Sequence, residues 1–185
     1  MKIIINLLNS ISYYYYPKNL DESNPDYFRT NQYKNYKELY SKWDKLKEDI
    51  NPVTKSFDNH FGTHNLVVNG VANHTPSYHL EILLSKNKAY KTVVSIYISM
   101  FIPFYHIVLL KENLKTSKVE FDYNLPTEIG DFSRKVILEK LSFQEFPTSL
   151  LSYKIPELIV RSDFNYFNAF FTDWYRVAPP NIETL

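Results

Sequence analysis

The stretch TVVSIYISMFIPFYHIVLL, residues 92–110, decides the fold of this chain because it is nearly all apolar and rich in β-branched and aromatic residues. A run of this length is just long enough to cross a bilayer as one helix. Residues 94–100, however, alternate between Val, Ile or Met and Ser or Tyr, which is the period of a β-strand. Pro103 and His106 are also unfavourable in a lipid-facing helix. The stretch therefore predicts buried β structure rather than a membrane span.

A single strand cannot contain the whole stretch. At about 3.3 Å per residue its length would be roughly 60 Å. A compact domain of 185 residues has a radius of gyration of about 16 Å. The chain must therefore turn near Pro103, which predicts two neighbouring core strands over about 92–101 and 104–110.

Patterns on either side of these strands predict the remaining elements. Asn24 and Pro25 form a helix start, and Asn51-Pro52 is expected to end the same helix. The predicted elements are a helix over about 25–50, a loop over 53–63, strands over 65–71, 78–84 and 119–123, a helix over about 128–146 and a short helix over about 163–175. Consecutive strands with short links favour an antiparallel meander. The predicted fold class is α+β, with an antiparallel sheet of about five strands and helices packed mainly on one face.

Length and composition limit the classes of function. A chain of 185 residues suits one domain, predicted to span 1–185. The formal net charge of +1 does not indicate nucleic-acid binding, and no membrane association is expected. The 185 residues include no cysteine, which excludes disulfides, thiolate nucleophiles and zinc ribbons among them. We therefore expect a cytoplasmic location. The apolar N-terminal run has no small-residue cleavage site after it, so we expect it to belong to the domain.

Four histidines crowd into one segment and are the main candidates for metal binding. His60 and His64 have the spacing of a helical metal pair, and His74 and His79 follow. A metal-dependent hydrolase, or another enzyme using this cluster, is therefore an alternative function. Gly62 interrupts the helical pattern between the first two histidines, so the sequence predicts no bound metal.

No other motif in the sequence indicates catalysis. There is no G-x-S-x-G element, and the three glycines are too far apart to form a phosphate-binding loop. No catalytic residue and no cofactor is predicted. A structural or scaffold subunit is a further alternative.

One face of the first core strand carries side chains suited to a protein interface. Ser95, Tyr97 and Ser99 alternate with the apolar residues of that strand. Tyr adds contact area at little entropic cost, and Ser adds adaptable hydrogen bonds. We therefore interpret these three residues as partner-binding. The alternative is that a helix over 25–50 or 128–146 covers this face and makes Tyr97 a core residue.

The apolar spacing of three segments gives a resemblance to a family of proteins. The segments are VSIYISMFIPFYHIVLL (94–110), FPTSLLSYKIPELIV (146–160) and FNAFFTD (167–173). Together they resemble small bacterial immunity proteins, which neutralise toxins delivered between competing cells. The resemblance implies a non-enzymatic, cytosolic, single-domain binder of one partner. The expected function is binding to another protein, a cognate toxin, and inhibiting it by covering its active site.

Overall fold

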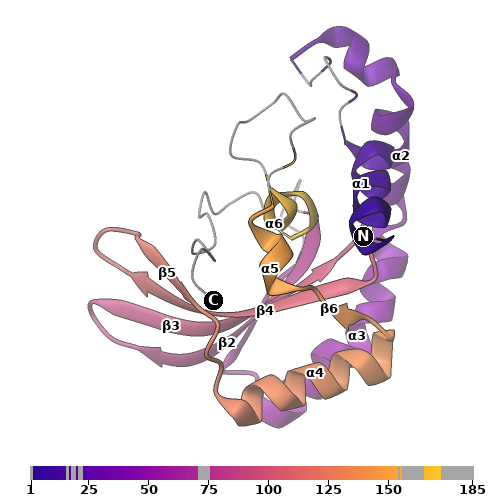
Figure 1. The fold of residues 1–185 in the computed structure, drawn as a ribbon. Helices are drawn as coiled ribbons and strands as arrows, with labels where there is room; N and C mark the ends of the chain where they lie inside the picture. The colour runs from indigo at the N-terminus through magenta and orange to yellow at the C-terminus, as the bar shows by residue number, and fades with distance from the viewer. Residues whose placement is uncertain are drawn as a thin grey trace.

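The computed structural model describes residues 2–15, 17, 20, 23–70, 76–153, 155 and 165–171. At its centre is a β-sheet (Figure 1) whose strands follow one another in chain order, β1-β2-β3-β4-β5, each antiparallel to the next. A two-residue strand, β6, runs parallel to β4. The strands are β1 (Leu66–Gly70), β2 (Ser77–Lys86), β3 (Tyr90–Ser99), β4 (Phe104–Asn113), β5 (Val119–Asp122) and β6 (Gln144–Glu145). The predicted antiparallel meander and the α+β fold class are confirmed.

Strands β3 and β4 are the two core strands predicted from the apolar stretch. The chain bends at residues 100–103 and returns alongside itself, as the length argument requires. Every residue from 93 to 102 is buried. Both faces of β3 are therefore covered by other parts of the chain.

Two long helices, α3 (Trp43–Phe61) and α4 (Thr127–Leu141), cover one face of the sheet (Figure 1). They also contact each other, because Phe57 of α3 and Phe132 of α4 meet edge to face with ring centroids 5.4 Å apart. One side of α4 belongs to this core cluster, which includes Ile129, Phe132, Val136, Ile137 and Leu141. The fully buried members of the cluster include Ile50, Val53, Phe57, Leu80, Val94, Ile96, Ile98 and Ile137.

The predicted helix over 25–50 is divided in the structure. Asn24 caps its start as predicted, because its side-chain oxygen accepts a hydrogen bond of 3.0 Å from the backbone N–H of Asp26. The element that begins there is a short 3₁₀ helix, and two α-helices follow it. They are η1 (Pro25–Arg29), α2 (Asn31–Ser41) and α3.

The prediction that Pro52 ends the helix is wrong, and so is most of the predicted loop over 53–63. Helix α3 continues through the proline to Phe61. A proline inside a helix removes one backbone hydrogen bond and crowds the preceding turn. Ile50 and Val53, on either side of it, are both fully buried against the sheet. Burial of such a side chain contributes about 1.5–3 kcal/mol, which offsets the cost of the proline.

Shorter helices cover the second face of the sheet, so helices lie on both faces. Helix α6 buries all five of its residues there, and α1, formed by the apolar N-terminal run, adds Leu7 and Ile11 to the same cluster. Two hydroxyl groups fix α6, because Ser77 donates to the carbonyl of Phe171 and Tyr15 donates to that of Ala169. The helices are α1 (Lys2–Tyr14), α5 (Thr148–Leu151) and α6 (Tyr166–Phe170). Within the described residues, no helix has the length and apolar character needed to cross a membrane.

Ser95→Asp and Ser85→Asp form a matched pair that tests whether both faces of β3 are buried. Ser95 is fully buried, whereas Ser85 is exposed near the end of β2. An unpaired carboxylate at position 95 loses its hydration, so we expect Ser95→Asp to cost about 3 kcal/mol or more of unfolding free energy. Ser85→Asp should change it by less than about 0.5 kcal/mol. Urea denaturation followed by circular dichroism measures both, and equal stabilities would show that the second face is hydrated.

Candidate functional site

The structure corrects the predicted partner-binding face. Ser95, Tyr97 and Ser99 are 0%, 1% and 1% exposed, respectively. Helix α6 covers this face, and the ring of its Phe167 meets Tyr97 edge to face at 5.7 Å between centroids. The covering element is a short helix far along the chain, not either of the long helices. These three side chains are core residues and cannot serve as a docking surface in this structure.

Beneath α6, three ring side chains form a row across strands β2, β3 and β4. His79, Tyr97 and His106 are directly opposite one another in the strand register. The rings of His79 and Tyr97 stack, with centroids 4.4 Å apart and an interplanar angle of 10°. His106 lies against Phe167 and Phe171, at 5.7 and 5.8 Å between centroids. The row packs as a layer of rings between the sheet and α6.

One buried ion pair lies beside this row. Glu81 is 6% exposed, and its carboxylate is 2.7 Å from the ammonium of Lys91. Burial lowers the pKa of His79 from 6.5 to about 4, although the neighbouring Glu81 carboxylate acts in the opposite direction. His79 is therefore neutral at pH 7. Its contact of 3.7 Å with Glu81 is not an ion pair at that pH.

His106 is buried at an energetic cost. It is 1% exposed, and neither of its ring nitrogens has a hydrogen-bond partner among the described residues. Burial lowers its pKa from 6.5 to about 3, so the ring is neutral. An unsatisfied buried polar group costs about 1–3 kcal/mol. His106 therefore weakens the packing of α6 on the sheet.

We predict that His106→Leu stabilises the domain and reduces its sensitivity to acid. The unfolded chain protonates His106 near pH 6.5 but the folded chain only near pH 3, so the stability of the native protein falls as the pH drops below about 6.5. The leucine variant has neither this proton-linked loss of stability nor the unsatisfied nitrogens. Its unfolding free energy should therefore be about 1 kcal/mol higher at pH 7. Chemical denaturation at pH 7.5 and pH 5 measures both effects.

The matched control is His64→Leu, which makes the same substitution at an exposed histidine. An equal pH dependence in His106→Leu and the native protein would show that His106 does not couple folding to protons.

The structure does not bring the histidines of the predicted cluster together. His60 stacks on Phe132 of α4 at 3.9 Å between centroids, on the face of the sheet that α3 and α4 cover. His79 lies on the opposite face, under α6, and His74 lies outside the described residues. Among the residues that the structure describes, no three His, Asp or Glu side chains are grouped so that they could hold a metal ion.

An exposed candidate site lies at the end of the sheet where two hairpins turn. The β2–β3 and β4–β5 hairpins extend side by side beyond the helices (Figure 1). Three large apolar residues are exposed along these hairpins: Leu84 by 37%, Tyr90 by 38% and Leu114 by 37%. Exposed aromatic and aliphatic side chains that gather in one region mark interaction surfaces. We call these three residues and the lysines around them the hairpin end.

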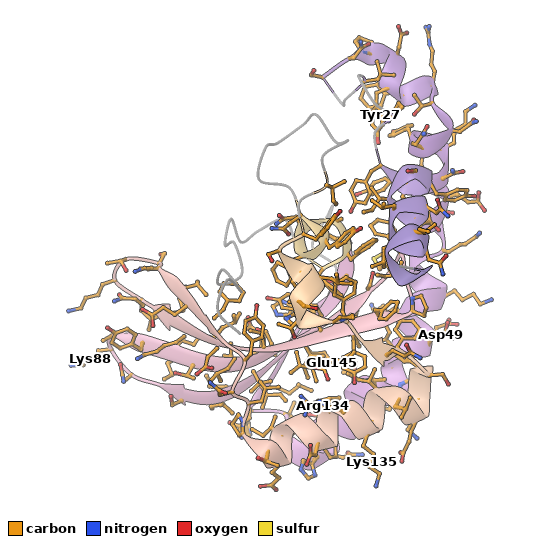
Figure 2. The ribbon with its side chains drawn as sticks, viewed as in Figure 1. Tyr27, Asp49, Lys88, Arg134, Lys135 and Glu145 are labelled. Carbon is orange, nitrogen blue, oxygen red and sulfur yellow. The ribbon has the colours of Figure 1, made fainter. Side chains whose placement is uncertain are left out.

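Lysines lie on the same two hairpins as these apolar residues. Lys88 lies at the tip of the β2–β3 hairpin and points away from the helices (Figure 2). The ammonium of Lys111 lies 4.7 Å from the centroid of the Tyr90 ring, a cation–π contact that orients the ring. The lysines of the two hairpins are Lys86, Lys88, Lys91, Lys111, Lys115 and Lys118.

Hydrogen bonds make the hairpin end rigid. The side-chain oxygen of Asn87 accepts from the backbone N–H groups of Ala89 and Tyr90, at 2.8 and 2.9 Å. Asn113 does the same in the second hairpin, and the N–H of Leu114 donates to the carbonyl of Ala89 across the two turns at 2.8 Å. A surface held in this way loses little conformational entropy on binding.

Comparison with known proteins gives no relative for this chain: no family model, curated protein or solved structure matches it.

The sequence contains a signal for the hairpin end. In a meander, the second and fourth turns of five strands lie at the same end of the sheet. The lysine-rich turns near residues 86–88 and 115–118 were therefore neighbours once the strands had been assigned.

Proposed function

We propose that this protein is a non-enzymatic, cytoplasmic protein-binding domain of the immunity-protein kind, which neutralises a cognate toxin by direct binding. Its interface is the hairpin end, and neither nucleic acid nor membrane is its target. The observation that supports this proposal is the group of exposed apolar residues, Leu84, Tyr90 and Leu114, on two hydrogen-bonded hairpins that also carry exposed lysines, at one end of the sheet. The earlier assignment of the interface to Ser95, Tyr97 and Ser99 is abandoned because these residues are buried.

The hairpin end has the physical properties that a protein inhibitor needs. Such an inhibitor requires no chemistry of its own, since a rigid projection that fills or covers an active site excludes the substrate. A few anchors, enriched in aromatic residues, supply most of the binding energy, and each contributes about 2 kcal/mol or more. Tyr90 is held by Lys111 before binding, so little of that energy is lost in ordering it.

The alternative of a metal-dependent hydrolase receives no support from the positions of the histidines. His60 and His79 lie on opposite faces of the sheet, and the His60 ring is stacked on Phe132. Ligands of one metal ion must all lie about 2 Å from it, which these two side chains cannot do across a packed sheet.

Leu114→Ser and Leu138→Ser test the interface as a matched pair. Both leucines are exposed, at 37% and 58%, but Leu138 lies on α4, away from the hairpins. We predict that co-expression with the product of an adjacent toxin gene rescues cell growth and that the two proteins co-purify. Leu114→Ser should weaken that complex at least tenfold, which corresponds to about 1.4 kcal/mol, and leave the melting temperature unchanged. Leu138→Ser should bind as the native protein does.

Two results would contradict the proposal. One is turnover of a substrate by the isolated protein, and the other is failure of any neighbouring gene product to bind it. If a partner binds but Leu114→Ser and Tyr90→Ala both bind it normally, the interface lies elsewhere and only the assignment of the hairpin end is wrong.

A further inference from the structure

We infer that the hairpin end recognises an acidic protein surface, in which carboxylates surround an apolar patch that receives Leu84, Tyr90 and Leu114. This inference rests on the proposed function and names the chemistry of the partner. Its basis is the positive charge on the same two hairpins as the apolar residues, most of which has no ion-pair partner among the described residues.

The hairpin end is strongly positive in a nearly neutral chain. Between positions 84 and 91 and between 111 and 120 there are six lysines and two glutamates, Glu112 and Glu120, which is a formal excess of four positive charges. The whole chain has a formal net charge of +1. The other residues together are therefore net negative, so the two hairpins carry a local excess of positive charge.

Among the described residues, acidic side chains lie near the lysines in the part of the hairpins closest to the core. Lys91 is paired with Glu81, and it also lies opposite Glu112 in the strand register. Lys111 lies opposite Glu120 and over the ring of Tyr90. These two lysines have partners within the fold, so the unneutralised charge lies further out.

Four ammonium groups remain available to a partner. Lys86, Lys88, Lys115 and Lys118 are exposed, and none of them forms an ion pair with another described residue. A neutral or basic partner that docked on the apolar residues would remove water from these groups without replacing it, at a cost in free energy. Carboxylates on the partner remove that cost by pairing with the ammonium groups, whereas positive charges on the partner would repel them. The lysines therefore select an acidic partner, while the apolar residues provide the anchor.

The same end fits a protein better than a nucleic acid. Proteins that bind single strands stack bases on the faces of aromatic rings. The Lys111 ammonium occupies one face of Tyr90, and the other two exposed residues, Leu84 and Leu114, are aliphatic and offer no stacking surface. Aliphatic and aromatic anchors inside a charged rim are instead the arrangement of protein interfaces.

The test uses two charge-reversal variants of the full chain with equal change in net charge. One carries Lys86→Glu, Lys88→Glu and Lys115→Glu, and the other carries Lys55→Glu, Lys135→Glu and Lys140→Glu on helices α3 and α4, where Figure 2 shows Lys135 far from Lys88. Circular dichroism and melting temperature confirm that each variant is folded. Lys88→Gln alone, at a hairpin tip, is the milder variant.

The probes are two short synthetic peptides and a short single-stranded DNA. One peptide has glutamates around a Leu-Leu centre, and the other has glutamines in place of the glutamates. We expect the glutamate peptide to bind at least tenfold more tightly than the glutamine peptide, to weaken with added salt, and to shift the backbone resonances of residues 84–91 and 111–118. The hairpin variant should lose this binding, Lys88→Gln should weaken it, and the helix variant should retain it. The toxin of the proposed function, once captured, should respond to the same variants in the same order.

Several outcomes overturn the inference. They are equal binding of the two peptides, unchanged binding by the hairpin variant, absence of binding by the glutamate peptide, and tighter binding of the single-stranded DNA. Leu114→Ser separates failure of the inference from failure of the proposed function. If Leu114→Ser weakens binding of the toxin but the hairpin variant does not, the interface stands and its acidic specificity falls. If neither variant affects the toxin, the interface itself is wrong.

Discussion

Burial of β3 on both faces is the constraint on which the rest of this structure depends. A strand whose residues are all buried from 93 to 102 needs a covering layer on each side. On one side, α3 and α4 provide long apolar helical faces. On the other side, α6 and α1 provide shorter ones. The first layer joins a helix that precedes the strands to one that follows them, and the second joins segments from near the two ends of the chain, so each layer depends on contacts between segments that are distant in sequence.

The second layer is the weaker one in physical terms. It buries Ser95 and both nitrogens of His106 without hydrogen-bond partners among the described residues, and each such group opposes folding. The anchors of α6 offset part of this cost, because Ser77 and Tyr15 donate hydrogen bonds to its last carbonyls. Rings of Phe167 and Phe171 add apolar contact with His106. Ser77 of β2 and Tyr15, which follows α1, thus help to hold α6 in place.

The sequence correctly predicted those features that depend on the local pattern of residues. Its predictions were wrong where contacts between distant segments determine the structure. Alternation of side chains located β3 and β4, and the need to turn near Pro103 followed from length alone. The same alternation placed Ser95 and Tyr97 correctly on the face opposite Ile96, but the inference that this face is exposed was wrong. Serine and tyrosine side chains can be either exposed or buried, and here they are buried because α6 covers this face of β3. The prediction that Pro52 ends the helix was wrong for the same reason. Burial of Ile50 and Val53 against the sheet outweighs the local tendency of proline to break a helix. The hairpin end could have been predicted from the sequence, since the topology of a meander brings its lysine-rich turns together.

Covering both faces of the sheet also determines where the protein can meet a partner. The faces are occupied by helices, which leaves the hairpins that extend beyond them (Figure 1). At that end the chain relies on hydrogen bonds within its turns and on the bond between Leu114 and Ala89 rather than on burial. Leu84, Tyr90 and Leu114 therefore add little to the core, yet they occupy fixed positions. Under the proposed function, stability and recognition are therefore separated along the strands. Substitutions at the lysines of the hairpin end would then alter the choice of partner without disturbing the buried layers.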